Sequence, residues 1–413
     1  MGSVPTLAPH SITGMATTKD SRLVFFLQLN QNSKTTVVVK GESNTLKQRA
    51  DTEASIKWGS KIMKNVNNEL VNTKILTATE IVELRRAATL FLSNLPNGQK
   101  KLQAVSDPQI VLTKLPYVDG LSDAEFRIEA DVGQAGDDST QLIKRLIHKF
   151  YKQATWIELG KIVAVDIFNG NQDRFTLNGD WANMGNVMFT GSGATMSVIG
   201  LDVFDPNSPF KNLNEKGTHA GLNILSDAAR RKAYALQCVT SVGTEMQRYL
   251  RLKAVGFLRT NHFTVSLTPP SGGPPRVTQI KYDDLPGFFA PFADDFEAGL
   301  AQGAQEMRDY LRRKVMEHRP DLLAPVGSHR TAAASSAVRS PALPPPPPPL
   351  AGGRLPPPPA PLVGARLPPP PAPLVAVRLP PAPAVNPSAP PRQASQKTIP
   401  PGVLDRMRFL GWL

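Results

Sequence analysis

Three polar residues, Asp173, Asn186 and Asp202, are spaced so that they could form one site. Asn186 precedes an apolar run at 187–189, a Gly-Ser-Gly turn follows, and a second apolar run ends at Asp202. This pattern predicts a hairpin that brings Asn186 and Asp202 to one end, with Asp173 in the preceding loop lying opposite them. One carboxylate can orient an attacking hydroxyl, while an amide oxygen and a second carboxylate suit Mg²⁺. The spacing therefore favours a phosphoryl-transfer site.

The loop around Asp173 reads Gly-Asn-Gln-Asp-Arg over residues 170–174 and resembles the catalytic segment of the atypical kinases. That group comprises phosphoinositide-kinase-like enzymes, bacterial toxin serine/threonine kinases and secretory-pathway casein-type kinases. The resemblance implies an α+β, bilobal protein-kinase-like fold with a small β-rich lobe and a larger helical lobe. It also implies ATP and Mg²⁺ as cofactors, with Asp173 as the catalytic residue and the Asn and second Asp as metal ligands. Two features depart from the pattern: Phe175 stands where His is usual, and residues 175–182 lengthen the interval to Asn186.

Asn178 competes with Asn186 as the metal ligand, because it follows Asp173 at the interval found in ordinary protein kinases. Asn186 is preferred, since an apolar strand follows it directly. The return strand also differs from ordinary kinases, because residues 200–204 read Gly-Leu-Asp-Val-Phe instead of containing Asp-Phe-Gly.

A kinase small lobe places a lysine on a strand, where it binds the α- and β-phosphates of ATP. Residues 22–29 and 35–40 have the composition of two strands joined by a polar turn, and Lys40 ends the second. The helical pattern that follows, residues 44–66, contains Glu53 at a position from which it can point back to Lys40. We therefore expect Lys40 and Glu53 to form an ion pair in the cofactor site. Two other acidic residues are alternatives for the role of Glu53: Glu42 and Asp51.

Residues 108–120 run from an apolar strand into a short Pro/Gly connector, which resembles the hinge between the lobes of a kinase. Backbone groups at Leu115 and Tyr117 would then bind the adenine of ATP. No Gly-rich loop precedes the first hairpin, and residues 14–19 are the only candidate for a phosphate-covering loop. The lack of glycines fits the phosphoinositide-kinase-like group better than ordinary protein kinases.

The composition is that of a protein with a substantial core, since 41% of its 413 residues are hydrophobic. The single cysteine, Cys238, excludes an intrachain disulfide and favours a reducing compartment. No apolar run is long enough to cross a membrane, so no transmembrane segment is expected. The formal net charge is +13. No nucleic-acid partner is expected, because the aromatic residues that such a site interleaves with basic ones are missing.

Most of the 40 prolines lie after residue 321. The sequence RLPPPPAPLV begins at Arg354 and again at Arg366, and a shorter copy begins at Arg378. Proline favours polyproline II, which SH3, WW and profilin-type domains bind, so residues 343–383 are predicted to recruit such a proline-reading domain. A rigid spacer is the alternative.

Apolar periodicity predicts helices at residues 79–95, 141–151, 154–168, 226–256 and 295–316. Residues 259–277, in contrast, look turn-rich. The expected division is an unstructured start with a candidate export signal at 1–20, a small lobe with the hinge at 21–120, a helical lobe with the catalytic loop at 121–320, a disordered proline-rich tail at 321–396 and a short C-terminal motif at 397–413. The last of these is apolar again and is expected to bind a partner groove, a membrane surface or the lobes themselves.

These features predict an atypical kinase that transfers the γ-phosphoryl group of ATP to a hydroxyl of a host protein or phosphoinositide. The Ser/Thr-rich start and the proline-rich tail resemble those of bacterial type III secreted effectors, which implies secretion by a bacterium into the host cytoplasm and a role in virulence. The alternative is a non-catalytic pseudokinase adaptor that recruits SH3- or profilin-type actin regulators through its polyproline tail. Nucleotidyl transfer, from an ATP held in the opposite sense, also stays open.

Overall fold

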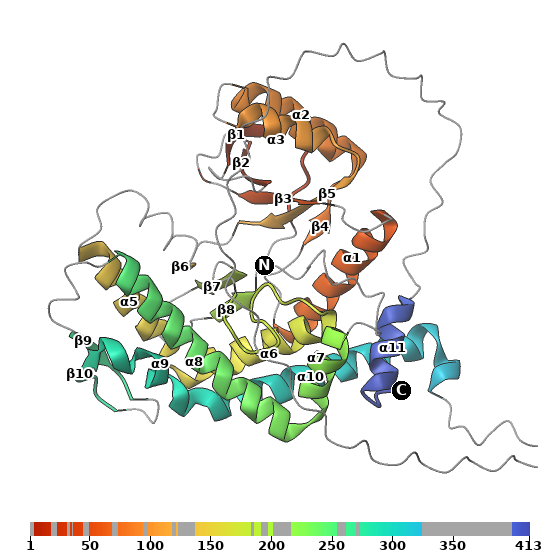
Figure 1. The fold of residues 1–413 in the computed structure, drawn as a ribbon. Helices are drawn as coiled ribbons and strands as arrows, with labels where there is room; N and C mark the ends of the chain where they lie inside the picture. The colour runs from red at the N-terminus through yellow and green to blue at the C-terminus, as the bar shows by residue number, and fades with distance from the viewer. Residues whose placement is uncertain are drawn as a thin grey trace, which may run out of the picture. The chain divides into compact units, whose positions relative to one another are not determined.

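The computed structural model of the protein combines a five-stranded antiparallel sheet, two smaller antiparallel sheets and a set of helices, so the fold is mixed α+β (Figure 1). Among the described residues, none of the helices has the length and apolarity that crossing a membrane requires. Asp202, residues 18–22 and the proline-rich repeats lie outside the described part. The structure describes residues 4–17, 23–30, 34, 36–43, 49–67, 73–93, 97–117, 121–122, 137–182, 186–190, 197–200, 216–253, 262–269, 273–323 and 399–413.

Five strands pair in the order β1-β2-β3-β5-β4, and each pair is antiparallel. The strands predicted at 22–29 and 35–40 are confirmed as β2 and β3. Lys40 does not end its strand, because residues 41–43 still pair with β5. The strands are β1 (Ile12–Thr17), β2 (Val24–Leu29), β3 (Val37–Ser43), β4 (Lys74–Ile75) and β5 (Ile110–Pro116).

Helices α2 (Ala78–Leu92) and α3 (Gly98–Ser106) cover one face of this sheet (Figure 1). α2 begins with a capping box, in which Thr77 and Glu80 each accept a hydrogen bond from the other's backbone N–H. It confirms the helix predicted at 79–95, whereas α3 has no counterpart among the expected helices. The core between helices and sheet is formed by Phe25, Leu27, Leu29, Val37, Val39, Leu84, Ala87, Ala88 and Leu92.

The stretch from residue 4 to β1 is fixed to α2 by buried carboxylates. Glu80 accepts a hydrogen bond from the N–H of Leu7 (3.0 Å) and forms an ion pair with buried Lys114 of β5. The expectation of an unstructured start is therefore wrong for residues 4–17, because α2 supplies acceptors for their backbone. Residues 14–17 of the candidate phosphate-covering loop lie in β1, where they pair with β2.

Glu83 should make the stability of this part of the fold sensitive to acid. Its carboxylate binds Arg86 and accepts the N–H groups of His10 (2.9 Å) and Ile12 (3.1 Å), and these bonds, the one to Arg86 first, lower its pKa from 4.5 to about 2. Because the pKa of Glu83 is lowered on folding, its ionised carboxylate stabilises the folded state above pH 4.5. This contribution, roughly 3 kcal/mol of unfolding free energy, is lost as the pH falls towards 2.

We expect Glu83→Gln to flatten the fall in urea-unfolding midpoint between pH 4.5 and 2.5, because glutamine carries no charge to protonate. Arg86→Met should flatten it only in part, since the two backbone N–H donors remain. An unchanged slope in Glu83→Gln would contradict this account.

Helix α1 (Arg49–Val66) contacts both the sheet and the helices that follow. In its first half, Ile56 packs with Val111 of β5 and Ile75 of β4. Side chains further along α1 belong to a second, larger core: Trp58, Ile62, Met63 and Val66. The helix therefore shares its side chains between the two cores.

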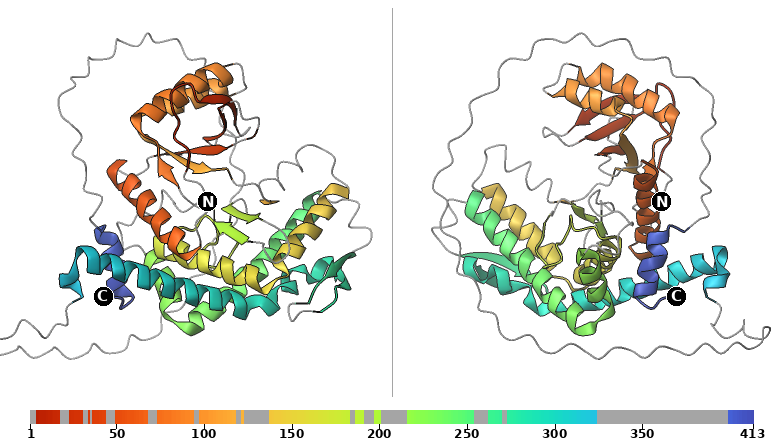
Figure 2. Two further views of the ribbon diagram at one scale, coloured as in Figure 1. Left: turned by 180° about the vertical axis from the view of Figure 1, so that it is seen from behind. Right: turned by 45° about the vertical axis from the view of Figure 1, so that its right-hand side comes forward.

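Helix α6 (Gln153–Asn169) lies in this second core alongside α10 (Ala293–His318) (Figure 2). Their backbones approach closely at glycines. A Cβ on Gly160 would lie 2.3 Å from the carbonyl oxygen of Phe296, and a Cβ on Gly299 would lie 2.2 Å from that of Ile157. A side chain at either glycine would force the helices apart, so this contact holds α6 firmly in place.

Most of the other elements in this core are helices. The helices predicted at 141–151, 154–168 and 295–316 are confirmed as α5 (Asp137–Phe150), α6 and α10. The helix predicted at 226–256 is confirmed as α8 (Ala228–Lys253), which begins two residues later, after Asp227. The turn-rich expectation for 259–277 is wrong for residues 262–267 and 276–277, because β9 (His262–Leu267) pairs with β10 (Arg276–Lys281). The helices not yet given are α7 (Lys216–Ser226) and α9 (Leu285–Phe288).

Residues 399–413 contain helix α11 (Pro401–Phe409). Val403 and Met407 of this helix are fully buried in the same core as α6. Of the alternatives expected for this stretch, the structure shows packing against the protein's own core. One compact unit accordingly comprises Met1–Leu323 and Lys397–Leu413.

Candidate active site

A buried ion pair lies at the end of α6. The helix ends at Gly170, whose φ of +75° is a left-handed conformation that glycine adopts without strain. The side chain of Asp166 is 2% exposed and pairs with the fully buried guanidinium of Arg174. Asn171 donates its Nδ2 group to the other carboxylate oxygen of Asp166 (3.1 Å) and its backbone N–H to the carbonyl of Asp166 (2.8 Å). Because breaking a buried pair is costly, this network fixes the loop to the helix.

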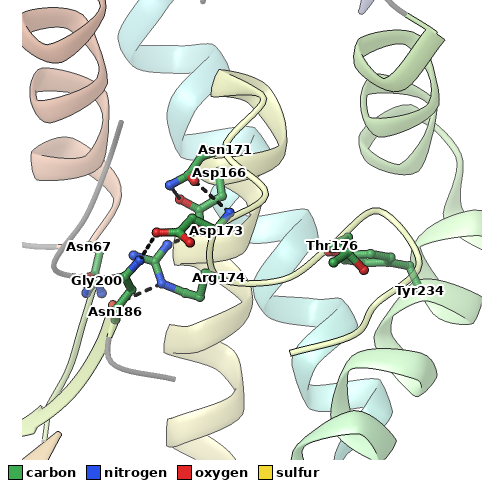
Figure 3. Close-up of polar contacts among 9 residues, drawn as sticks. All are labelled: Asn67, Asp166, Asn171, Asp173, Arg174, Thr176, Asn186, Gly200 and Tyr234. Carbon is green, nitrogen blue, oxygen red and sulfur yellow. Dashed lines mark hydrogen bonds and ion pairs between the residues drawn. The ribbon is translucent and has the colours of Figure 1, made fainter. Parts of the chain in front are cut away.

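The network places Asp173 beside Asn186 (Figure 3). The Nδ2 group of Asn186 donates to Oδ2 of Asp173 (2.7 Å), and the backbone N–H of Asp173 donates to Oδ1 of Asn171 (3.0 Å). Nε of Arg174 donates to the carbonyl of Asn186 (3.2 Å), so Arg174 holds both Asp166 and the start of the hairpin. Asp173 itself is exposed. The structure thus brings together two of the three residues predicted from spacing.

The segment 175–182 folds back on itself, which explains how a long interval still brings the two site residues together. Phe175 and Trp181 form an antiparallel bridge, and their rings stack with centroids 5.5 Å apart. The N–H of Ala182 donates to the carbonyl of Arg174 (3.0 Å), so the chain leaves and returns at one place. The phenylalanine that replaces the usual histidine is buried and serves packing.

The alternative metal ligand, Asn178, lies in the turn of this segment. Its backbone N–H donates to the hydroxyl of Thr176 (3.3 Å), and the carbonyl of Thr176 accepts from the hydroxyl of Tyr234 on α8 (3.1 Å). Figure 3 shows Thr176 and Tyr234 on the side of the loop away from Asp173. This placement favours Asn186 over Asn178.

Strands β7 (Val187–Thr190) and β8 (Ser197–Gly200) form the predicted hairpin directly after Asn186, and β6 (Leu121–Ser122) pairs with β7. Val187 lies opposite Gly200, so the return strand comes back to the level of Asn186. Asn67, after α1, accepts a hydrogen bond from the N–H of Gly200 (3.4 Å). Asp202 follows two positions later and lies outside the described residues, so its place in the site stays a prediction.

Lys40 lies on the face of the five-stranded sheet opposite to α2 and α3. It stands across from Thr113 of β5, and strand alternation puts Val111 on the same face. Val111 contacts Ile56 of α1, and Glu53 lies one turn earlier on the same side of that helix. Glu53 is therefore on the side of α1 that faces the row containing Lys40.

The pairing of Lys40 with Glu53 stays a prediction. Glu53 forms an ion pair with Lys57, one turn further along α1 (Nζ to Oε2, 3.6 Å). Of the two alternatives, Glu42 lies on β3 on the same face as Lys40, and Asp51 lies in the first turn of α1.

The hinge prediction needs one correction. Leu115 is buried in β5, opposite Val38. The N–H of Tyr117 donates to the carbonyl of Thr36 (3.0 Å), so in this conformation that group is not open to adenine. Tyr117 is 40% exposed, and its ring contacts that of Phe26 edge to face, with centroids 6.5 Å apart. Any contact of the Tyr117 backbone with adenine would have to use its carbonyl.

The oxygen atoms of Asp173 and Asn186 suit Mg²⁺, which prefers hard ligands. Since Nδ2 of Asn186 binds Asp173, Oδ1 of Asn186 is the atom that can bind a cation. Within the described ranges, no group of three or more His, Cys, Asp or Glu side chains is placed to hold a metal ion. The described residues therefore fit part of a magnesium site, and Asp202 would have to complete it.

Sequence reasoning missed two of the residues that support the site, Asp166 and Asn171. A signal was present for the first, because Asp166 interrupts the apolar run 162–168, and a carboxylate inside such a run is buried only when paired. The role of Asn171 depends on the helix ending at Gly170 and has no comparable signal.

Comparison with family models, with curated proteins and with solved structures finds no match. The function must therefore be inferred from the geometry of the site.

Proposed function

We propose that the protein is an ATP-dependent kinase that transfers the γ-phosphoryl group to a hydroxyl of a protein or a phosphoinositide. The observation that carries this proposal is the 2.7 Å hydrogen bond between Asp173 and Asn186. It puts an exposed carboxylate beside an amide at the start of a hairpin. Protein kinases use the same two residue types, an Asp that accepts the hydroxyl proton and an Asn that binds Mg²⁺.

The order of elements around Lys40 supports the proposal. In protein kinases the phosphate-binding lysine lies on the third strand, and its glutamate partner lies on the next helix. Here Lys40 lies on β3 and Glu53 on α1, the element that follows. We therefore propose a bilobal, protein-kinase-like arrangement, in which the five-stranded sheet with α2 and α3 is the small lobe.

A half-buried apolar row beside Lys40 supports a site for the adenine ring. Val24 stands across from Lys40, and Phe26 stands across from Val38, so all four side chains share one face of the sheet. The three apolar members are only partly buried, unlike their neighbours under α2. A flat, apolar base would cover this row and place its phosphates towards Lys40.

In the proposed reaction, the acceptor oxygen attacks the γ-phosphorus and the bond from that phosphorus to the bridging oxygen of ADP breaks. The hydroxyl proton passes to the exposed carboxylate of Asp173. Asn186 and Asp202 would hold Mg²⁺, which when bound neutralises phosphate charge. Arg174 stays buried and keeps Asp173 and Asn186 in register.

The proposal is tested by incubating the protein with Mg²⁺, ATP labelled at the γ-phosphate, and host extract. We expect label in a protein or lipid, and its loss in Lys40→Met and in Asp202→Ala. Lys74→Met is the matched control, because Lys74 is an exposed lysine on the same sheet. A Lys74→Met variant as inactive as Lys40→Met would argue against a specific role for Lys40.

A pseudokinase adaptor is the second candidate, favoured by the buried Phe175 and by the engaged N–H of Tyr117. Mg²⁺-dependent nucleotide binding without γ-label in any acceptor would support it, and label from the α-phosphate would indicate nucleotidyl transfer. We further propose, from the sequence alone, action in a host cytoplasm after export and recruitment of a proline-reading domain by residues 343–383.

A further inference from the structure

Residues 399–413, here called the C-terminal segment, pack on α6 just before the candidate active site. The ring of Trp412 stacks on that of Phe168, with centroids 5.6 Å apart and planes 6° apart. Val403 and Met407 are fully buried in the same core. The segment is thus a built-in part of the core, although it follows the rest of the unit only after Ala324–Gln396.

Phe168 links this contact to the site. It lies in the last turn of α6, two residues after Asp166 and two before the end of the helix at Gly170. Asp166 in the same turn holds Asn171 and Arg174, which in turn fix the loop. Aromatic stacking is worth about 0.5–1.5 kcal/mol beyond the area it buries. Losing the stack would therefore loosen the turn that carries the anchor of the active-site network.

We propose that the C-terminal segment is a positioning element of the active site. Trp412, acting through Phe168, keeps the last turn of α6 in place and so keeps Asp173 beside Asn186 during phosphoryl transfer. Trp412 is a positioning residue, because it is proposed to act on Asp173 and Asn186 through Phe168 and the last turn of α6. The expected effect of Trp412 on the rate rests on the proposed kinase function, whereas its expected effect on the conformation of the loop does not depend on that function.

The test compares three variants of the full chain. Trp412→Ala removes the stack, and Trp412→Phe keeps an aromatic ring over Phe168. Met407→Ala is the matched control, because it empties a fully buried position of the same segment and leaves both rings of the stack unchanged. All three are measured well below their unfolding temperatures, so that loss of folded protein does not contribute.

We expect Trp412→Ala to lower kcat by roughly ten- to hundredfold, as small displacements of catalytic groups do. The KM for ATP should change less than kcat, because the adenine and Lys40 part of the proposed nucleotide site lies on the sheet, away from this loop. Trp412→Phe should restore most of kcat, and Met407→Ala should leave it within about twofold of the parent. Equal losses in Trp412→Ala and Met407→Ala would mean that the segment only completes the core, and would overturn the proposal.

Hydrogen exchange separates this inference from the proposed function. The backbone N–H groups of Asn171 and Asp173 are bonded to Asp166 and Asn171, so their exchange reports the loop without any assay of activity. We expect exchange at both to be about tenfold faster or more in Trp412→Ala, and unchanged in Met407→Ala. If neither the parent nor any variant transfers phosphate but this exchange pattern is found, the kinase proposal fails and the positioning role stands. Unchanged exchange in Trp412→Ala would refute the positioning role.

Discussion

Changing Asp173 to asparagine is expected to lower the rate of phosphoryl transfer by about 10²- to 10⁴-fold, the range for losing a general base. The amide has the same shape as the carboxylate and can still accept the hydrogen bond from Asn186, so the loop should keep its conformation. Because Asp173 is exposed, the unfolding midpoint should hardly move. The rate is measured with γ-labelled ATP, and nucleotide affinity is measured separately by titration.

Asp180→Asn is the matched control for this prediction. Asp180 is another exposed carboxylate of the same loop, seated in the turn where it accepts from the hydroxyl of Thr176 (3.3 Å). We expect its rate to stay within about twofold of the parent, as for surface changes away from a site. Should Asp180→Asn lose activity while Asp173→Asn keeps it, the assignment of the base is wrong.

The second large effect is expected at the buried pair of Asp166 and Arg174. Asp166→Asn leaves a buried guanidinium without its charged partner, and Arg174→Met leaves a buried carboxylate, so each should destabilise the fold by about 3–5 kcal/mol. Urea unfolding measures this loss. Activity should fall with it, because the loop that carries Asp173 is held by these two side chains.

The double variant Asp166→Leu/Arg174→Met distinguishes stability from positioning. Replacing a buried ion pair by apolar side chains is often neutral for stability, so we expect most of the unfolding free energy to return. The rate should not return, because Nε of Arg174 also holds the carbonyl of Asn186. Full recovery of both quantities would show that the pair has no role in placing the site.

Local signals were enough to predict several parts of this site. The apolar periodicity of residues 154–168 gave the helix that carries the loop, and the Gly-Ser-Gly turn gave the hairpin after Asn186. A hairpin fixes which ends meet, so the meeting of Asn186 with the loop of Asp173 could be expected. The strand positions around Lys40 followed in the same way from short-range alternation.

The remaining features depend on contacts between distant parts of the chain. Residues 4–17 look unstructured on their own, and their backbone is ordered by the carboxylates of Glu80 and Glu83 on α2 together with the pairing of β1 with β2. From the sequence alone, Trp412 belongs to a short motif for a partner, and the structure is needed to show that it stacks on Phe168. The burial of Arg174 likewise follows from a partner on another element, so no local pattern around the loop indicates it.

The attachment of residues 4–12 to α2 determines how the protein would respond to mechanical force. Among the described strands, β1 is at the edge of the sheet and pairs with β2 alone, so a pull from the side of residue 4 loads its hydrogen bonds one after another instead of all at once. The bond from Lys114 to the carbonyl of Pro5 and the bonds to Glu80 and Glu83 come first in that series, followed by the β1–β2 ladder. Peeling in this order needs little force at any moment and uncovers the apolar core under α2 early. An unfolding enzyme that pulls the chain from this side would therefore meet low mechanical resistance.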